Sequence, residues 1–141
     1  MIRKASAVWN GSVKEGSGNI EVGSGAVGTL PYSFAKRFGD EPGTNPEELV
    51  AAAHAACFTM ALSFELGNAG HPPTSINTDA QLTMGSQAEG WAVKEIALKV
   101  RAKVEGVSDS EFQAIAKGAK ENCPISKLLN TTITLDAGLE S

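Results

Sequence analysis

The sequence predicts a single domain of the α+β class, residues 1–141, built around one central helix. Its 141 residues are the length of one ordinary domain, and 42% of them are hydrophobic, which is enough for a core. The longest helical pattern, from Thr44 to Gly67, has almost no polar face and therefore belongs at the centre of the fold. The patterns along the chain run strands, helix, strands, helix, strand, which is not the regular alternation of a doubly wound sheet.

Strand patterns precede the central helix. Apolar residues alternate from Ile2 to about Val13, Asn10-Gly11 is a strong hairpin signal, and a further strand is expected from about Asn19 to Val22. Glycines interrupt this region so often that it cannot bury enough surface alone. We expect a small meander that lies against another element, of this chain or of a partner. Pro31 to Phe38 is expected to be semi-extended and amphipathic.

The central helix has a well-specified start. Asn45 can accept hydrogen bonds from the first turn, Pro46 suits the first helical position, and Glu48 stands where a capping-box partner belongs. Gly67 and Gly70 end the helix.

Two strands are expected after the helix. Ser75 to Met84 places its apolar residues on one face, and Trp91 to Val104 forms a longer strand. The apolar positions of the longer strand change from odd to even near Lys94-Glu95, which predicts a β-bulge there.

The last part of the chain predicts two helices and a strand. A capping box at Ser108 opens the first helix, and Pro124 closes it because the residue before a proline is driven out of the helical region. Pro124 to Leu129 can form a short helix, and Thr131 to Leu135 alternates as a final strand. Cys123 therefore lies at a helix break.

Charge and apolar patterning exclude some classes of partner. The net charge is -4 and basic clusters are absent, which argues against nucleic acid and anionic membranes. The N-terminus has no apolar signal core, and we expect no apolar run of the roughly 20 residues that span a bilayer. A soluble, cytoplasmic protein is expected. In that compartment two cysteines are more often unpaired, metal-bound or redox-active than joined in a structural disulfide.

Cys57 and Cys123 are the strong nucleophiles of the chain. Burial in the apolar helix would raise the pKa of Cys57, so a reactive Cys57 needs a nearby cation, for which Arg37 is the candidate. Cys123 caps a short helix whose N–H groups and dipole favour a thiolate. Local chemistry alone favours Cys123 as the more acidic thiol. A packing role for Cys57 and a solvated Arg37 remain open alternatives.

Glu47 is the candidate carboxylate, because Glu48 takes the capping role. Glu47 and Cys57 are ten positions apart on one helix, or about 15 Å at about 1.5 Å per residue, so they cannot touch within one chain. A site that uses both needs a second copy of the helix, packed antiparallel in a two-fold dimer. The small residues at 51–56 suit that close approach.

His54 offers a second possible chemistry. It precedes Cys57 by three positions and, with Cys123, would form a partial metal site. A fourth ligand of comparable quality is lacking, so a His54 that packs or orients in the core is the favoured interpretation.

Four motifs contain both cysteines, Arg37 and Glu47. They are Pro31-Tyr32-x-Phe34-x-x-Arg37-Phe38, Gly43-Thr44-Asn45-Pro46-Glu47-Glu48-Leu49, Ala52-Ala53-His54-Ala55-Ala56-Cys57-Phe58-x-Met60-Ala61-Leu62-Ser63 and Asn122-Cys123-Pro124-x-Ser126. Together they closely resemble the OsmC and organic hydroperoxide resistance family of thiol peroxidases. His54 before Ala55-Ala56-Cys57 resembles the OsmC branch.

This resemblance implies an intertwined homodimer in which two antiparallel-rich, six-stranded sheets wrap two central helices. The N-terminal strands, within residues 1–30, would pair with the sheet of the partner subunit. The two equivalent sites would lie at the subunit interface.

The resemblance also implies a role for each candidate residue. Cys57 would be the peroxidatic cysteine, Cys123 the resolving cysteine, Arg37 the group that stabilises the thiolate and the transition state, and Glu47 its orienting salt-bridge partner. This assignment opposes the local interpretation of Cys123 as the more reactive thiol, and we adopt it because Arg37 can outweigh burial.

The implied activity is reduction of organic hydroperoxides, and less well of hydrogen peroxide, through a cysteine sulfenic acid and an intramolecular disulfide. Apolar walls from Phe34, Phe38, Phe58 and Met60 would favour the organic substrates. The implied role is defence against oxidative or osmotic stress. An external dithiol, possibly a lipoyl group, would reduce the disulfide, with no prosthetic cofactor and no metal.

Two other functions fit the residues. A dimeric module could bind a small hydrophobic ligand while the cysteines merely pack, and would then be indifferent to Cys57→Ser. A thiol-sensing or metal-binding regulator would use His54, Cys57 and Cys123 without turnover.

Overall fold

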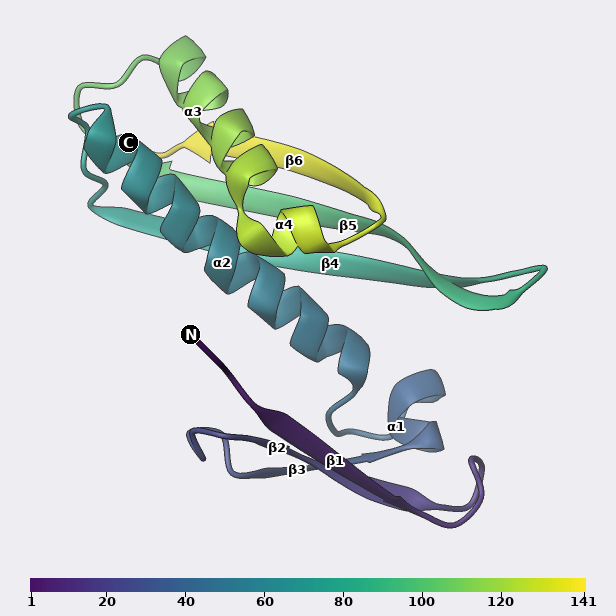
Figure 1. Ribbon diagram of the computed structural model, residues 1–141. Coiled ribbons are helices and arrows are strands. Elements are labelled where there is room, and N and C mark those ends of the chain that lie inside the picture. Colours follow the sequence, from purple (N-terminus) through teal and green to yellow (C-terminus); the bar gives the residue numbers. More distant parts are fainter. The chain divides into compact units, whose positions relative to one another are not determined.

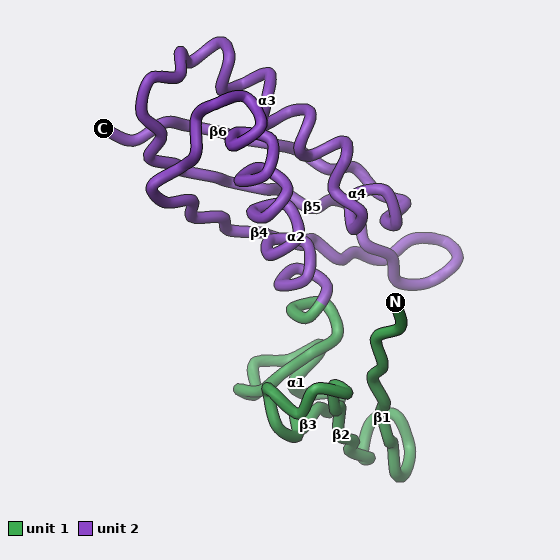
Figure 2. Tube along the Cα trace, turned by 60° about the vertical axis from the view of Figure 1, so that its left-hand side comes forward, with its two compact units in different colours: residues 1–49 green, residues 50–141 purple.

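The computed structural model describes residues 1–141 and contains six strands and four helices (Figure 1). The chain forms two compact units, residues 1–49 and residues 50–141, which Figure 2 colours separately. We call them the N-terminal and C-terminal units and describe each by itself. Helix α2 (Pro46–Asn68) begins in the first and continues through the second.

The sheet of the N-terminal unit is the expected meander. Strands β1 (Ala5–Asn10), β2 (Ser17–Val22) and β3 (Thr29–Ser33) are antiparallel in the order β1-β2-β3. The first turn is longer than Asn10-Gly11 suggests, because residues 11–16 separate β1 from β2. No hydrophobic side chain of this unit is fully buried, which agrees with the expectation that the meander cannot form a core alone.

The expectation of a semi-extended segment from Pro31 to Phe38 is wrong in its second half. Phe34–Phe38 form a short helix, α1, capped by the Ser33 hydroxyl, which accepts a hydrogen bond from the Lys36 N–H at 3.2 Å. A serine three residues before the bonded N–H is a helix-start signal. Pro31 lies in strand β3, which ends at Ser33, so the extended half of the expectation is confirmed.

The C-terminal unit contains a mixed sheet in the order β4-β5-β6. Strands β4 (Ser75–Gln87) and β5 (Gly90–Lys103) are antiparallel, and β6 (Thr132–Leu139) runs parallel to β5. The predicted bulge is confirmed: Thr83 pairs with Glu95 but Met84 pairs with Val93, which leaves Lys94 as the extra residue.

Two further helices follow β5, as predicted. The Ser108 hydroxyl caps α3 (Asp109–Asn122) by accepting from the Glu111 N–H at 3.2 Å. Helix α4 (Pro124–Leu128) begins with proline at its first turn. Helices packed on a mixed sheet, beside a separate antiparallel meander, confirm the α+β class.

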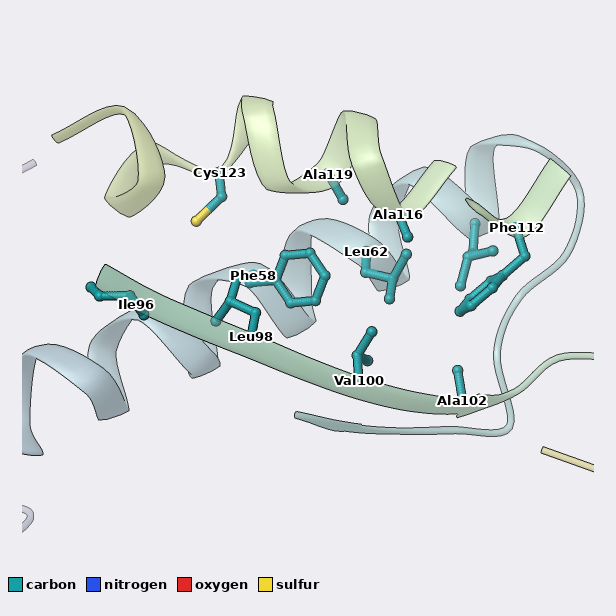
Figure 3. Packing of buried hydrophobic residues seen from close by; sticks show 11 residues of the cluster. Phe58, Leu62, Ile96, Leu98, Val100, Ala102, Phe112, Ala116, Ala119 and Cys123 are labelled. Carbon is teal, nitrogen blue, oxygen red and sulfur yellow. The ribbon is translucent and has the colours of Figure 1, made fainter. Parts of the chain in front are cut away.

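The core of the C-terminal unit lies where α2 and α3 pack against β5 (Figure 3). All fully buried hydrophobic residues belong to these elements or to the break between α3 and α4. They are Phe58, Leu62 and Leu66 from α2, Ile96, Leu98, Val100 and Ala102 from β5, Phe112, Ala116 and Ala119 from α3, and Cys123.

Helix α2 has a buried and an exposed face. The buried face presents His54, Phe58, Leu62 and Leu66. The opposite side carries an exposed stripe of small and apolar residues at helical spacing, which we call the outer stripe: Ala53, Ala56, Met60, Ser63, Phe64 and Gly67.

By length and composition alone, the 23-residue helix α2 would also qualify as a membrane span, because its most apolar stretch has a mean hydropathy of 1.6. The expectation that no uninterrupted apolar run reaches about 20 residues still holds, because polar and charged residues interrupt α2. The core helix of a soluble protein passes the same test.

Candidate functional site

The C-terminal unit brings the two cysteines together. The Sγ atoms of Cys57 and Cys123 lie 3.0 Å apart, although 66 positions separate them in sequence. Both are free thiols; Cys57 is half-buried, whereas Cys123 is fully buried. In Figure 3 the side chain of Cys123 points from the α3–α4 junction toward the layer that contains Phe58 and Ile96.

Two helix ends position Cys123. Its N–H donates to the Ala119 carbonyl at 2.9 Å and closes α3, and its own carbonyl accepts from the Lys127 N–H at 3.1 Å in α4. Pro124 occupies the first turn of α4, where its missing N–H costs nothing. The Cys–Pro break therefore directs the thiol toward the first N–H groups of α4 and toward α2.

The environment changes the acidity of the two thiols in opposite directions. Burial raises the pKa of Cys57, the hydrogen bond with Cys123 raises it further, and the Ile125 N–H only partly opposes this. Burial also acts to raise the pKa of Cys123, but hydrogen bonds from the Cys57 thiol, from the N–H and hydroxyl of Ser126 and from the Ile125 N–H hold it below its usual value. Within this unit Cys123 is the more acidic thiol, as local chemistry predicts.

His54 lies in the core next to this pair of thiols. Its Nε2 is 2.8 Å from the Ser126 Oγ, and its Nδ1 is buried without a hydrogen-bond partner in the protein. Burial lowers the pKa of His54, so the ring is neutral at neutral pH. This placement agrees with a His54 that packs and orients.

The alternative metal site does not assemble from these residues. No group of three or more His, Cys, Asp or Glu side chains is arranged to hold a metal ion. His54 Nε2 is instead engaged by Ser126.

Ser126 is the functional candidate that sequence reasoning did not single out. It appeared only as the last residue of the Asn122-Cys123-Pro124-x-Ser126 motif. The available signal was its position three residues after Cys123, because the third residue of a helix directs its N–H and side chain toward the capping residue.

The N-terminal unit joins the other two candidates. Arg37 Nε donates to the Glu47 Oε1 and Oε2 at 3.0 and 3.2 Å, and Arg37 Nη2 donates to Oε1 at 2.7 Å. Asn45 Oδ1 accepts from the Glu48 N–H at 2.8 Å and caps α2, which leaves Glu47 for Arg37. The expected ion pair is therefore present, and its role in catalysis stays a prediction.

An apolar hollow of about 220 Å³ lies beside Arg37 in this unit. Its walls are the side chains of Trp9, Val13, Tyr32, Ser33, Phe34, Arg37 and Phe38. The Arg37 guanidinium carbon lies 5.0 Å from the centre of the Phe38 ring, which favours the cation. The predicted walls Phe34 and Phe38 line this hollow. Phe58 is a core residue with no exposed surface and cannot line a substrate site, so that expectation is wrong.

Comparison with known proteins gives a consistent result. Residues 39–137 match the family described as OsmC-like protein. The chain is 48% identical to Peroxiredoxin OsmC of Escherichia coli over 139 residues, which cover 99% of this chain and 97% of that protein. It is 35% identical to the organic hydroperoxide resistance protein OhrA of Bacillus subtilis over 101 residues, 71% of this chain and 68% of the relative.

Solved structures share the fold. An OsmC-like protein of unknown function from Vibrio cholerae aligns with a TM-score of 0.78 at 18% identity, covering 97% of this chain and 99% of the other. The organic hydroperoxide resistance protein OhrB of Bacillus subtilis aligns with a TM-score of 0.70 at 23% identity, covering 95% and 97%.

Proposed function

This chain belongs to the OsmC family, and from that premise we propose that it is a cysteine-based peroxidase that reduces organic hydroperoxides to alcohols. One observation carries the proposal: two free thiols with Sγ atoms 3.0 Å apart, of which only Cys57 is partly exposed. The names of its relatives, a peroxiredoxin and organic hydroperoxide resistance proteins, support the same reaction.

The difference in exposure between the two thiols assigns each of them to one step of the reaction. The Cys57 thiolate attacks the distal oxygen of ROOH, the O–O bond breaks, and the alkoxide leaves as ROH after protonation. The Cys123 thiolate then attacks the Cys57 sulfenic acid, which forms the disulfide and releases hydroxide, protonated to water. An external dithiol reduces the disulfide. Burial keeps Cys123 from peroxide, so it resolves rather than attacks, although it is the more acidic thiol of the unit.

A cation must therefore lower the pKa of Cys57 before it can react at neutral pH. The Arg37–Glu47 pair supplies this cation from the partner subunit, because Glu47 lies ten residues before Cys57 on the same helix, about 15 Å along its axis. The three hydrogen bonds to Glu47 hold the guanidinium in one orientation. Its positive charge then stabilises the thiolate and the charge that develops on the peroxide oxygens.

Three features support the dimer that this arrangement needs. The outer stripe of α2 exposes Met60 by 76% and Phe64 by 66%, beside small residues that let a second helix approach closely. Each three-stranded sheet has two unpaired edges, and pairing β1–β3 with the sheet of a partner would give six strands. The N-terminal unit also has no buried hydrophobic residue of its own, so a partner would supply its core.

The apolar hollow beside Arg37 favours alkyl or aryl hydroperoxides over hydrogen peroxide, because an apolar wall stabilises the organic group and not a second hydroxyl. A lipoyl group, itself an apolar dithiol, is the proposed reductant. The cytoplasm, where dithiol reductants are kept reduced, is the proposed location, and defence against oxidative or osmotic stress the proposed role.

Stopped-flow oxidation of the reduced protein by cumene hydroperoxide and by hydrogen peroxide tests this function, with Cys57→Ser and Cys123→Ser run in parallel. We expect rapid consumption by the wild type and by Cys123→Ser, sulfenic acid accumulating in Cys123→Ser, and no reaction of Cys57→Ser. Slow consumption by every variant would show that the thiols are inert. It would favour the alternative function, a dimer that binds a small hydrophobic ligand.

A further inference from the structure

Buried His54 and half-buried Ser126 form a polar pair that the proposed chemistry has not used. His54 has no exposed surface, and one of its two ring nitrogens, Nδ1, has no hydrogen-bond partner. The other, Nε2, lies 2.8 Å from Ser126 Oγ. Ser126 is in the first turn of α4, three residues after Cys123, the residue that precedes this helix as its N-cap. A residue at this position directs its side chain back toward the cap residue, and the Ser126 hydroxyl is among the groups that hold the pKa of Cys123 below its usual value.

The unpartnered Nδ1 indicates where the single ring proton resides. A neutral imidazole carries one N–H and one lone pair, and a buried N–H without a partner is rarer in proteins than an unsatisfied acceptor. The proton therefore resides on Nε2, which donates to Ser126 Oγ. Since the serine oxygen accepts this bond, its own O–H is free to donate elsewhere, and Cys123 is the neighbour that can accept it.

We propose that Ser126, oriented by His54, is a positioning residue that directs its hydroxyl proton to the Cys123 sulfur and stabilises Cys123 as a thiolate. The thiolate of Cys123 is needed twice. It is the nucleophile that closes the disulfide on the Cys57 sulfenic acid. It is also the leaving group when an external thiolate attacks the more exposed Cys57 sulfur and breaks the S–S bond. The role of Ser126 in turnover rests on the proposed peroxidase activity, whereas its effect on the acidity of Cys123 does not.

The other titratable groups around Cys123 make their contacts elsewhere. On α2 they are Cys57 and His54 themselves. Lys120 of α3 donates to a β6 carbonyl at 3.2 Å, and Glu95 of β5 accepts from a β6 hydroxyl at 3.0 Å. Lys127 of α4 is exposed to solvent. None of these charged side chains is among the groups that lower the pKa of Cys123.

A titration without turnover tests the effect on acidity. The ultraviolet absorbance of the thiolate is followed against pH in the Cys57→Ser background, where Cys123 is the single thiol. Ser126→Ala should move the midpoint up by about 1 pH unit, the size expected from losing a hydrogen bond to a charged group, whereas Ser126→Thr, which keeps a hydroxyl, should restore it.

His54 provides a matched pair of variants. His54→Gln keeps an N–H donor near the position of Nε2 and should leave the midpoint in place. The amide of His54→Asn is one methylene shorter, so its N–H does not reach Ser126 and the midpoint should rise. Circular dichroism checks that each variant is folded. An unchanged midpoint in folded Ser126→Ala, or equal midpoints for His54→Gln and His54→Asn, would overturn the inference.

Kinetics separate this inference from the proposed function. With both cysteines present, Ser126→Ala should react with cumene hydroperoxide at the wild-type rate but close its disulfide about threefold more slowly, because loss of thiolate is partly offset by higher nucleophilicity. If the peroxide step slows as much as closure, Ser126 does not act through Cys123. If the wild type consumes no hydroperoxide while the Cys123 midpoint still moves as expected, the positioning inference stands and the peroxidase proposal fails.

Discussion

The Sγ atoms of Cys57 and Cys123 lie 3.0 Å apart, and the two thiols differ in both exposure and acidity. Cys57 is reachable but has a raised pKa, whereas Cys123 is acidic but fully buried. In the proposed peroxidase this difference assigns one step to each thiol: the more exposed Cys57 would react with the hydroperoxide, and the buried Cys123 would form the disulfide in the second step.

One equivalent of cumene hydroperoxide should convert the reduced protein to a form with an intramolecular Cys57–Cys123 disulfide. The sulfur atoms need to approach by only about 1 Å to reach the S–S bond length. Thiol counting and mass spectrometry of peptides under non-reducing conditions would detect the link. Cys123→Ser is the control and should form none. A product crosslinked between subunits instead would contradict the 3.0 Å geometry.

Breaking the Arg37–Glu47 pair should slow the peroxide step. Arg37→Lys keeps the charge but loses the two-nitrogen fork, and Glu47→Gln loses the ionic partner. Each should lower kcat/KM for cumene hydroperoxide roughly 10- to 100-fold, as expected for a charge-assisted hydrogen bond. Glu48→Gln, which changes the adjacent and exposed carboxylate, is the matched control and should retain activity. Equal effects at positions 47 and 48 would indicate that only the helix dipole matters.

The buried His54 should make the protein less stable in acid. Its pKa is lowered in the folded state relative to 6.5, so the unfolded chain takes up a proton at higher pH than the folded protein. Stability from this group is complete above that unfolded value and falls as the pH drops from it toward the folded value. Urea unfolding at about pH 7.5 and about pH 5.5 should show a larger loss for the wild type than for His54→Gln, which does not titrate. Equal losses would show that His54 has the same pKa in the folded and the unfolded state, as a solvated histidine does.

A charge on the outer stripe should separate the predicted dimer. Phe64 is exposed by 66% in the single chain, and Phe64→Asp would place an unpaired carboxylate in an apolar interface between two copies of α2. Analytical ultracentrifugation should show a dimer for the wild type and a monomer for the variant, with loss of peroxidase activity. Val27→Asp, at an exposed apolar residue in the loop between β2 and β3, is the control and should remain dimeric. A wild-type monomer with full activity would refute the shared site.

The sequence alone determined most of the local structure, because its signals act within a few residues. Asn45 and Pro46 specify the start of α2, Ser108 that of α3, and the shift of apolar parity locates the bulge at Lys94. The periodicity of the sequence does not predict the short helix α1, because five residues are too few to show a helical repeat.

Only the tertiary structure decided how distant residues meet. The motif resemblance implies that Cys57 and Cys123 act together, but no local pattern in the sequence gives their separation of 3.0 Å. Nor does one assign Phe58 to the core rather than to a substrate wall, or join His54 to Ser126. These relationships depend on the packing of α2, α3 and α4 against β5, in which side chains far apart in sequence exclude water together. The sequence by itself supplies the reactive groups and the helix-end signals that orient them. Long-range packing sets the distances, burial and acidity on which their chemistry depends.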